Sequence, residues 1–83
     1  MTYFVYVIGS YKKSKLITYV GYTRNLKKRL ELHNKGKGAK FTRGRTWKVM
    51  YFEKYKAKKE AILREYYIKK NRKFRNLIKK EFK

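Results

Sequence analysis

The fold is decided by the stretch Tyr3-Phe4-Val5-Tyr6-Val7-Ile8, close to the start of the chain. Every residue in it is aromatic or β-branched, and none is charged. A strand without polar alternation is typically buried on both faces, so we expect it at the centre of its sheet. The next residues, 9–15, are mostly polar and predict a loop, and residues 16–20 predict a second strand. Strands joined by so short a loop form an antiparallel hairpin.

The hairpin is followed by a predicted helix over residues 24–34. Leu26 and Leu30 are spaced by four residues, which places both on one face of such a helix. Thr23 is the predicted N-cap, because its hydroxyl can accept a hydrogen bond from a free backbone N–H in the first turn. Gly36 lies just beyond the expected end of the helix.

The second half of the chain predicts one more strand and two more helices. The strand covers residues 47–53, the second helix residues 57–69, and a shorter third helix follows Asn71. The order β-β-α-β-α-α provides too few strands for a doubly wound sheet. We therefore expect an α+β fold in one domain, residues 1–83, with a small three-stranded antiparallel sheet flanked by helices.

Charge is the most distinctive property of the composition. The chain has 26 lysines and arginines against five acidic residues, which gives a formal net charge of +21. A folded chain with this charge repels itself and needs an anionic partner or counterions, and nucleic acid is the leading candidate for a partner. An anionic membrane surface is one alternative, and lysines that only keep the surface solvated are another. Aromatic residues make up 18% of the chain, which argues against disorder.

The missing residue types narrow the possible sites and locations. The chain has no cysteine, so a disulfide and a thiolate metal site are both excluded, and a reducing interior fits this composition. No apolar run approaches the ~20 residues that span a bilayer, and the first residues lack the basic segment of a secretory signal. We therefore expect a cytoplasmic protein that does not act on membranes.

Arg29 and His33 form the first candidate pair for chemistry. They lie four residues apart and so share one face of the helix predicted over residues 24–34. A guanidinium offers phosphate oxygens a planar fork of donors, and an imidazole exchanges protons near neutral pH. The pair therefore suits phosphodiester chemistry. The alternative stays open, since arginine is unremarkable in so basic a chain and a lone histidine is usually structural.

Glu65 is the candidate metal ligand. It shares a narrow sector of the second predicted helix with the apolar Ala61 and Ile68. An ionised carboxylate in such surroundings needs a metal ion or a cation. Mg²⁺ takes one or two protein carboxylates and keeps water and substrate phosphate as its other ligands, so one glutamate can suffice for Mg²⁺ or Mn²⁺. The alternative is an ion pair with one of three basic residues that project in similar directions, Lys58, Lys69 and Arg72.

The segment between the first helix and the third strand is basic and contains glycines. We expect its cations to contact phosphates, because glycine lets the backbone approach a ligand closely. The alternative is a flexible connection without a binding role. The candidate nucleic-acid-binding residues are Lys37, Lys40, Arg43 and Arg45.

Two pairs of segments together resemble the GIY-YIG nucleases. Phe4-Val5-Tyr6-Val7-Ile8 and Thr18-Tyr19-Val20-Gly21-Tyr22-Thr23 are similar to the two signature segments of that family, with Tyr6 and Tyr19 at the signature tyrosines. Asn25 to His33 resembles the catalytic helix of the family, and Leu63-Arg64-Glu65-Tyr66 resembles the segment that carries its metal-binding glutamate. Residues 36–42 are similar to the small stand-alone subfamily related to the UvrC N-terminal domain.

The resemblance implies a metal-dependent endonuclease that hydrolyses phosphodiester bonds in nucleic acid. The implied enzyme selects DNA by its structure, as nucleases of repair or recombination do. The implied cofactor is Mg²⁺ or Mn²⁺ at Glu65. A water near Tyr6, Tyr19 or His33 would lose its proton and attack phosphorus, while Arg29 would stabilise the developing charge. Two alternatives remain open: a nucleic-acid-binding module with little turnover, and a subunit that receives its specificity from a protein partner.

Overall fold

Three antiparallel strands form one sheet in the order β2-β1-β3. The computed structural model describes residues 1–82 and gives the strand bounds as β1 (Tyr3–Lys12), β2 (Lys15–Thr23) and β3 (Lys48–Tyr55). The helices are α1 (Leu26–Asn34), α2 (Lys58–Lys70) and α3 (Arg72–Phe82). The predicted element order, the α+β class and the central position of the first strand are all confirmed.

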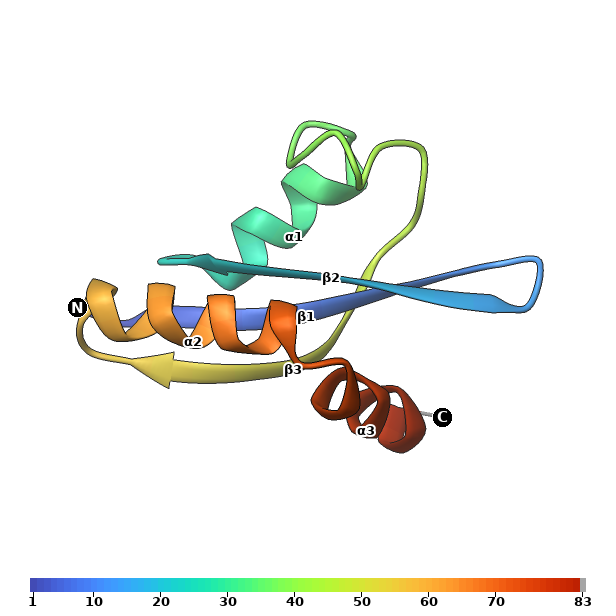
Figure 1. Cartoon of the computed structure of the whole chain (residues 1–83). Helices are drawn as coiled ribbons and strands as arrows, with labels where there is room; N and C mark the ends of the chain where they lie inside the picture. Colours follow the sequence, from blue (N-terminus) through green and yellow to red (C-terminus); the bar gives the residue numbers. More distant parts are fainter. Residues whose placement is uncertain (83) are drawn as a thin grey trace.

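The two faces of β1 bury different sets of side chains. Val5 and Val7 point to one face, where they pack with the core of α2 and α3. Tyr6 and Ile8 point to the other face, toward α1, as the two-residue period of a strand requires. All four are buried, which explains why this strand lacks polar residues. α1 and the loop after it lie above the strands in Figure 1, and α3 lies below them.

The predicted antiparallel hairpin is confirmed, but the loop predicted over residues 9–15 is too long, because both strands continue into it. Ladder pairing reaches Lys12 and Lys15, so that only Lys13 and Ser14 turn the chain. Both turn residues have positive φ, 52° and 66°. Two residues in this region give a hairpin turn whose twist matches that of the flanking strands.

The predicted N-cap of the first helix is also wrong. Thr23 remains in β2, paired with Phe4, and α1 begins only at Leu26. Asn25 is the N-cap instead, and its Oδ1 accepts a hydrogen bond of 3.0 Å from the backbone N–H of Lys28. Thr23 and Asn25 are both good caps by residue type, and the length of the strand ladder decides between them.

The end of α1 lies where the glycine predicted it. Gly36 has φ +78°, a left-handed conformation that glycine adopts without strain. The backbone N–H of Lys37 donates to the Leu32 carbonyl at 2.9 Å, and that of Gly36 donates to the His33 carbonyl at 3.1 Å. These two bonds satisfy carbonyls that the last helical turn leaves free.

α2 and α3 cover the face of the sheet opposite α1. Ala61 and Ile68 of α2 and Ile78 of α3 are buried against the valines of β1. The burial of Ala61 and Ile68 confirms the sector predicted for the second helix. Within residues 1–82, no helix combines the length and the apolar character needed to cross a bilayer.

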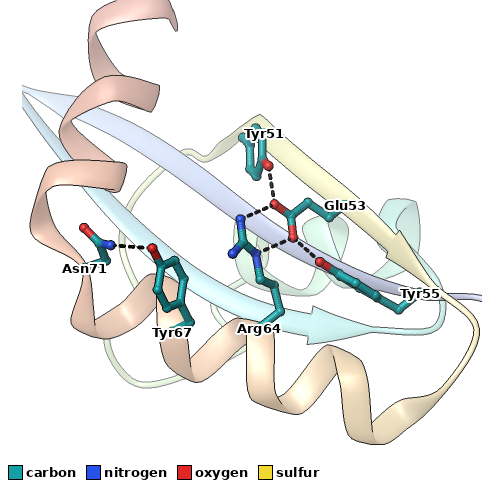
Figure 2. A network of polar contacts seen from close by, with 6 residues as sticks. All are labelled: Tyr51, Glu53, Tyr55, Arg64, Tyr67 and Asn71. Atoms are coloured by element: carbon teal, nitrogen blue, oxygen red, sulfur yellow. Dashed lines mark hydrogen bonds and ion pairs between the residues drawn. The ribbon is translucent and has the colours of Figure 1, made fainter.

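A polar cluster anchors α2 to β3, as Figure 2 shows. Arg64 of α2 donates from Nε and Nη2 to the two carboxylate oxygens of Glu53, at 2.8 and 2.9 Å. Tyr51 and Tyr55 donate their hydroxyls to the same carboxylate. Burial raises the pKa of Glu53, but these hydrogen bonds outweigh it and hold the pKa below its usual value. Because Arg64 is fixed in this way, the direction of its neighbour Glu65 is fixed as well.

Candidate active site

A chain of three hydrogen bonds is buried between α1 and the loop that follows it. Tyr6 Oη lies 2.8 Å from His33 Nε2, and His33 Nδ1 lies 2.9 Å from Thr42 Oγ1. Thr42 in turn donates its hydroxyl to the Ala39 carbonyl at 3.0 Å. The side chains of Tyr6, His33 and Thr42 are all removed from solvent.

This series of hydrogen bonds determines which ring nitrogen of His33 carries the proton. The single hydroxyl proton of Thr42 is used on Ala39, so Thr42 Oγ1 must accept a proton from His33 Nδ1. Nε2 of a neutral ring is then unprotonated and accepts the hydroxyl of Tyr6. Burial and the charge of Arg29 both lower the pKa of His33, which keeps the ring neutral at pH 7. His33 thus presents a free base to a tyrosine.

Arg29 lies beside this chain and is only partly paired. Its Nη2 donates to the Gly38 carbonyl at 3.2 Å, while its Nε is buried without a hydrogen-bond partner within residues 1–82. Burial raises the pKa of Tyr6, and the Arg29 guanidinium partly offsets that rise. A buried N–H without a protein partner is rare in proteins and has a donor to spare for water or for a ligand.

Tyr19 lies between the buried hydrogen bonds of His33 and the surface. Its ring meets the His33 ring edge to face at 5.2 Å between centroids and stacks on the exposed Phe41 at 6.0 Å. Beside it lies an open hollow of ≈ 340 Å³, whose cationic lining residues are Lys69 and Arg75. Arg75 of α3 was not among the predicted site residues, and its Nε is also buried without a partner within the described chain. We call this depression the basic hollow.

Glu65 approaches the site from α2, on the opposite side of the sheet. Its Oε2 lies 3.3 Å from Lys69 Nζ, so one of the ion pairs considered above is formed. The carboxylate also raises the pKa of Tyr6, as the weakest of five effects on that hydroxyl. Glu65 is therefore within electrostatic range of Tyr6, while Tyr6, Tyr19, Arg29 and His33 form the closer group.

The loop between α1 and β3 serves this group structurally as well as through its charge. Asn34 and Trp47 clamp its two ends together: Trp47 N–H donates to Asn34 Oδ1 at 2.6 Å, and Asn34 Nδ2 donates to the Trp47 carbonyl at 3.2 Å. A Cβ on Gly38 would overlap the His33 ring, so this glycine gives space to a side chain. The indole N–H of Trp47 also donates to the Thr42 carbonyl at 2.9 Å.

The four predicted phosphate-binding cations of this loop differ in exposure. Lys37, Lys40 and Arg43 are exposed and can reach a polyanion. Arg45 is half-buried, and its Nη1 has no hydrogen-bond partner within residues 1–82. The loop therefore offers three solvated charges and one that is already partly desolvated.

Residues 2–79 match the GIY-YIG catalytic domain. The chain belongs to the GIY-YIG family. It is 50% identical over 68 residues to a UPF0213 protein of Clostridium perfringens, covering 81% of this chain and 70% of the relative. It is 43% identical over 81 residues to a UPF0213 protein of Oceanobacillus iheyensis, covering 96% and 91%.

A solved structure agrees with this assignment. The solution NMR structure of a UPF0213 protein from Bacillus halodurans is 35% identical in sequence and superposes with a TM-score of 0.50. The match covers 95% of this chain and 84% of the other. The predicted family is thus confirmed, and membership of this nuclease family implies nucleic-acid binding and endonuclease activity.

Proposed function

We propose that this GIY-YIG protein is a divalent-metal-dependent endonuclease that acts in the cytoplasm and prefers flapped or branched DNA, as in repair or recombination. The observation that carries the proposal is the buried chain Tyr6–His33–Thr42 beside a partly unpaired Arg29. Both ring nitrogens of His33 are satisfied, as they would be in a structural histidine. What favours a catalytic role is that the donor to Nε2 is a tyrosine hydroxyl and that both groups lie next to a cation suited to a phosphate.

The Tyr6–His33 pair is the general base in this mechanism. As the attacking water loses a proton to the Tyr6 oxygen, Tyr6 passes its own proton to His33 Nε2. The hydroxide oxygen bonds to phosphorus, and the bond to the leaving oxygen breaks. Tyrosine alone is a poor general base because its free pKa of about 10 keeps it protonated, and His33 Nε2 accepts that proton as the Tyr6 oxygen receives one from the water. Thr42 holds the ring in the receptive tautomer.

Arg29 of the active-site group and the cations of the basic hollow stabilise the charge that develops on the phosphate. Arg29 has an N–H without a protein partner, and Lys69 and Arg75 line the hollow, which has no acidic lining residue. Donors that are already in place before the reaction are usually the largest catalytic contribution, and removal of one typically costs about 10²–10³ in rate. The exposed loop cations Lys37 and Lys40 bind the phosphates of the nucleic acid on either side of the bond that is cleaved.

The residues around Glu65 fit a single divalent ion. The Glu65 side chain is 18% exposed, and Lys69 is its one ion-pair partner within residues 1–82. The described chain holds no cluster of three or more His, Cys, Asp or Glu side chains, so Glu65 would hold the ion together with water and substrate oxygens. When bound, Mg²⁺ or Mn²⁺ would supply Lewis-acid stabilisation of the leaving oxygen.

A cleavage assay with matched glutamate variants tests the proposal. Purified protein is incubated with branched, duplex and single-stranded DNA in Mg²⁺ or Mn²⁺, and after chelation of the metal. We expect cleavage that requires metal, is strongest on branched DNA, and falls at least about 100-fold in Glu65→Ala. Glu60→Ala, an exposed change on the same helix, should cleave as wild type does. A wild type that cuts none of the substrates, or a Glu65→Ala protein that cuts normally, would refute the assignment.

The ion pair between Glu65 and Lys69 favours a second candidate function, a nucleic-acid-binding module with little turnover. A carboxylate neutralised by a lysine stabilises α2 without any metal. This alternative predicts binding that weakens steeply as salt rises, through release of counterions, and that is unchanged in Glu65→Ala. Cleavage that disappears with Glu65 would eliminate it.

A protein partner that supplies specificity stays a prediction. The net charge of +21 attracts nucleic acid irrespective of its base sequence, which leaves sequence selection to such a partner. Purification at native abundance tests this, and a solitary monomer in size-exclusion chromatography would count against it.

A further inference from the structure

A second groove lies on the α1 face of the sheet, between α1 and β3. It has a volume of ≈ 600 Å³ and an apolar floor formed by Phe4, Leu30, Val49 and Phe52. Phe52 is the cross-strand neighbour of Tyr6 and therefore points to the same face of the sheet. The groove thus shares its face with the active-site group but lies toward the opposite edge of the sheet, because β2 and β3 are the two edge strands.

Phe52 is more exposed than its place on the sheet would require. Its side chain lies on the α1 face, yet the residue is 47% exposed, because α1 has only nine residues and does not reach over it. Phe4 meets the Phe52 ring edge to face, with 5.9 Å between the centroids. This contact fixes the orientation of an aromatic ring that remains about half exposed to solvent.

The rim of the groove carries only positive charge. Arg24, Lys27 and Lys54 line it, all three are exposed, and no acidic residue is among the lining residues. An apolar aromatic floor with a cationic rim matches the chemistry of unpaired nucleotides, whose bases stack and whose phosphates are negative. The bases of an intact duplex are already stacked on one another and cannot use this floor.

We propose that this groove binds an unpaired segment of nucleic acid, with a base stacked on Phe52 and phosphates held by Lys27 and Lys54. The inference rests on the proposed function in so far as nucleic acid is the substrate. The groove contacts the first half of α1, and the active-site His33 lies in the last turn of the same helix. A flap or single strand held there would keep the neighbouring phosphodiester bonds close to the site, which gives the preference for branched substrates a physical basis.

Equilibrium binding tests the proposal without relying on cleavage. The probes are a fluorescein-labelled oligothymidylate of about ten nucleotides, within the usual range of single-strand site sizes, and a blunt duplex. We expect Phe52→Ala to weaken oligothymidylate binding roughly 5- to 150-fold, the value of one base–aromatic stack, and to leave duplex binding nearly unchanged. Phe52→Trp should retain or increase the affinity, and Leu77→Ala, an equally apolar exposed change on α3, should have no effect.

The lysines give an independent readout if Phe52→Ala fails to fold. Each of Lys27→Ala and Lys54→Ala should reduce the slope of log affinity against log salt for the single strand by about 0.7. The proposal is overturned if Phe52→Ala binds oligothymidylate like wild type, or weakens single strand and duplex equally. A labelled acidic peptide serves as a further probe. The proposal is also overturned if Phe52→Ala no longer binds this peptide but still binds oligothymidylate as wild type does. Glu65→Ala should still bind the oligonucleotide, so failure of the groove and failure of the nuclease assignment are distinguishable.

Discussion

Thr42→Val tests the link between the loop and the proton carried by His33. Valine keeps the branched shape of threonine but has no oxygen, so the buried His33 Nδ1–H loses its acceptor. A buried donor without a partner costs about 1–3 kcal/mol. The total stability expected for 83 residues is about 4–12 kcal/mol, at ~0.05–0.15 kcal/mol per residue. A loss of this size should lower Tm by about 4–8 °C for each kcal/mol.

The ring can reduce this cost by changing tautomer. If the proton moves to Nε2, His33 donates to the Tyr6 oxygen and no longer accepts its hydroxyl. The cleavage rate should then fall by more than the loss of folded protein explains, because Nε2 can no longer accept the Tyr6 proton. Thr42→Ser is the matched control, since it keeps the hydroxyl and removes one methyl group, which is worth about 0.8 kcal/mol of burial.

Three measurements separate these outcomes. Urea unfolding gives the stability change, cleavage gives the activity, and nitrogen NMR reports the tautomer directly because the chain has a single histidine. We expect a proton on Nδ1 in wild type and in Thr42→Ser, and on Nε2 in Thr42→Val. A wild-type ring protonated at Nε2, or a Thr42→Val protein with unchanged tautomer and stability, would refute the reasoning.

Three further changes test other parts of the same structure. The pKa of His33 is below its usual 6.5 in the folded state, so the unfolded state binds more protons below that pH. The free energy of unfolding should therefore fall as the pH drops below about 6.5. In urea titrations, His33→Gln should flatten this dependence on pH. Gly38→Ala places a Cβ into the His33 ring and should lower both Tm and cleavage. Gly44→Ala has open space around its Cβ but a φ of +75°, so it should lower Tm through backbone strain alone, leave the ring in place and cleave as wild type does. Glu53→Gln removes the charge that pairs with Arg64 and should cost about 2 kcal/mol in urea unfolding; a cost below that of an exposed glutamate change would mean that the cluster does not hold α2.

The elements of the fold could be predicted from local patterns, and their ends could not. The unbroken apolar run at residues 3–8 predicted the central strand, because a strand needs apolar residues at every position only when both of its faces are buried. The N-cap was misplaced because Thr23 and Asn25 are equally suitable as residue types. The choice depends on how far β2 pairs with β1, which is a tertiary property. The two-residue turn at Lys13 and Ser14 was predicted as a longer loop, because neither is a residue that usually takes positive φ.

The site was predicted as far as spacing within single helices allows. Arg29 and His33 do lie together, since the Arg29 charge lowers the pKa of His33, and Ala61 and Ile68, which mark the sector predicted for Glu65, are buried. The partners of His33 were out of reach, because Thr42 and Gly38 come from a loop whose path is set by the contacts of Trp47. Arg75 lines the basic hollow through the packing of α3, and no short motif in the sequence marks such a position.

The order of the strands has a consequence for synthesis on the ribosome. β1 is made first, but its second neighbour, β3, appears only after the hairpin, α1 and the long loop have been made. Until then one edge of the most apolar strand is open to other chains, and nascent proteins in this state are prone to associate. Residues 1–47 carry 12 lysines and arginines against one acidic residue, a net charge of +11, so growing chains repel one another during that interval. The same lysines that attract a polyanion can thus protect the chain before it has a fold.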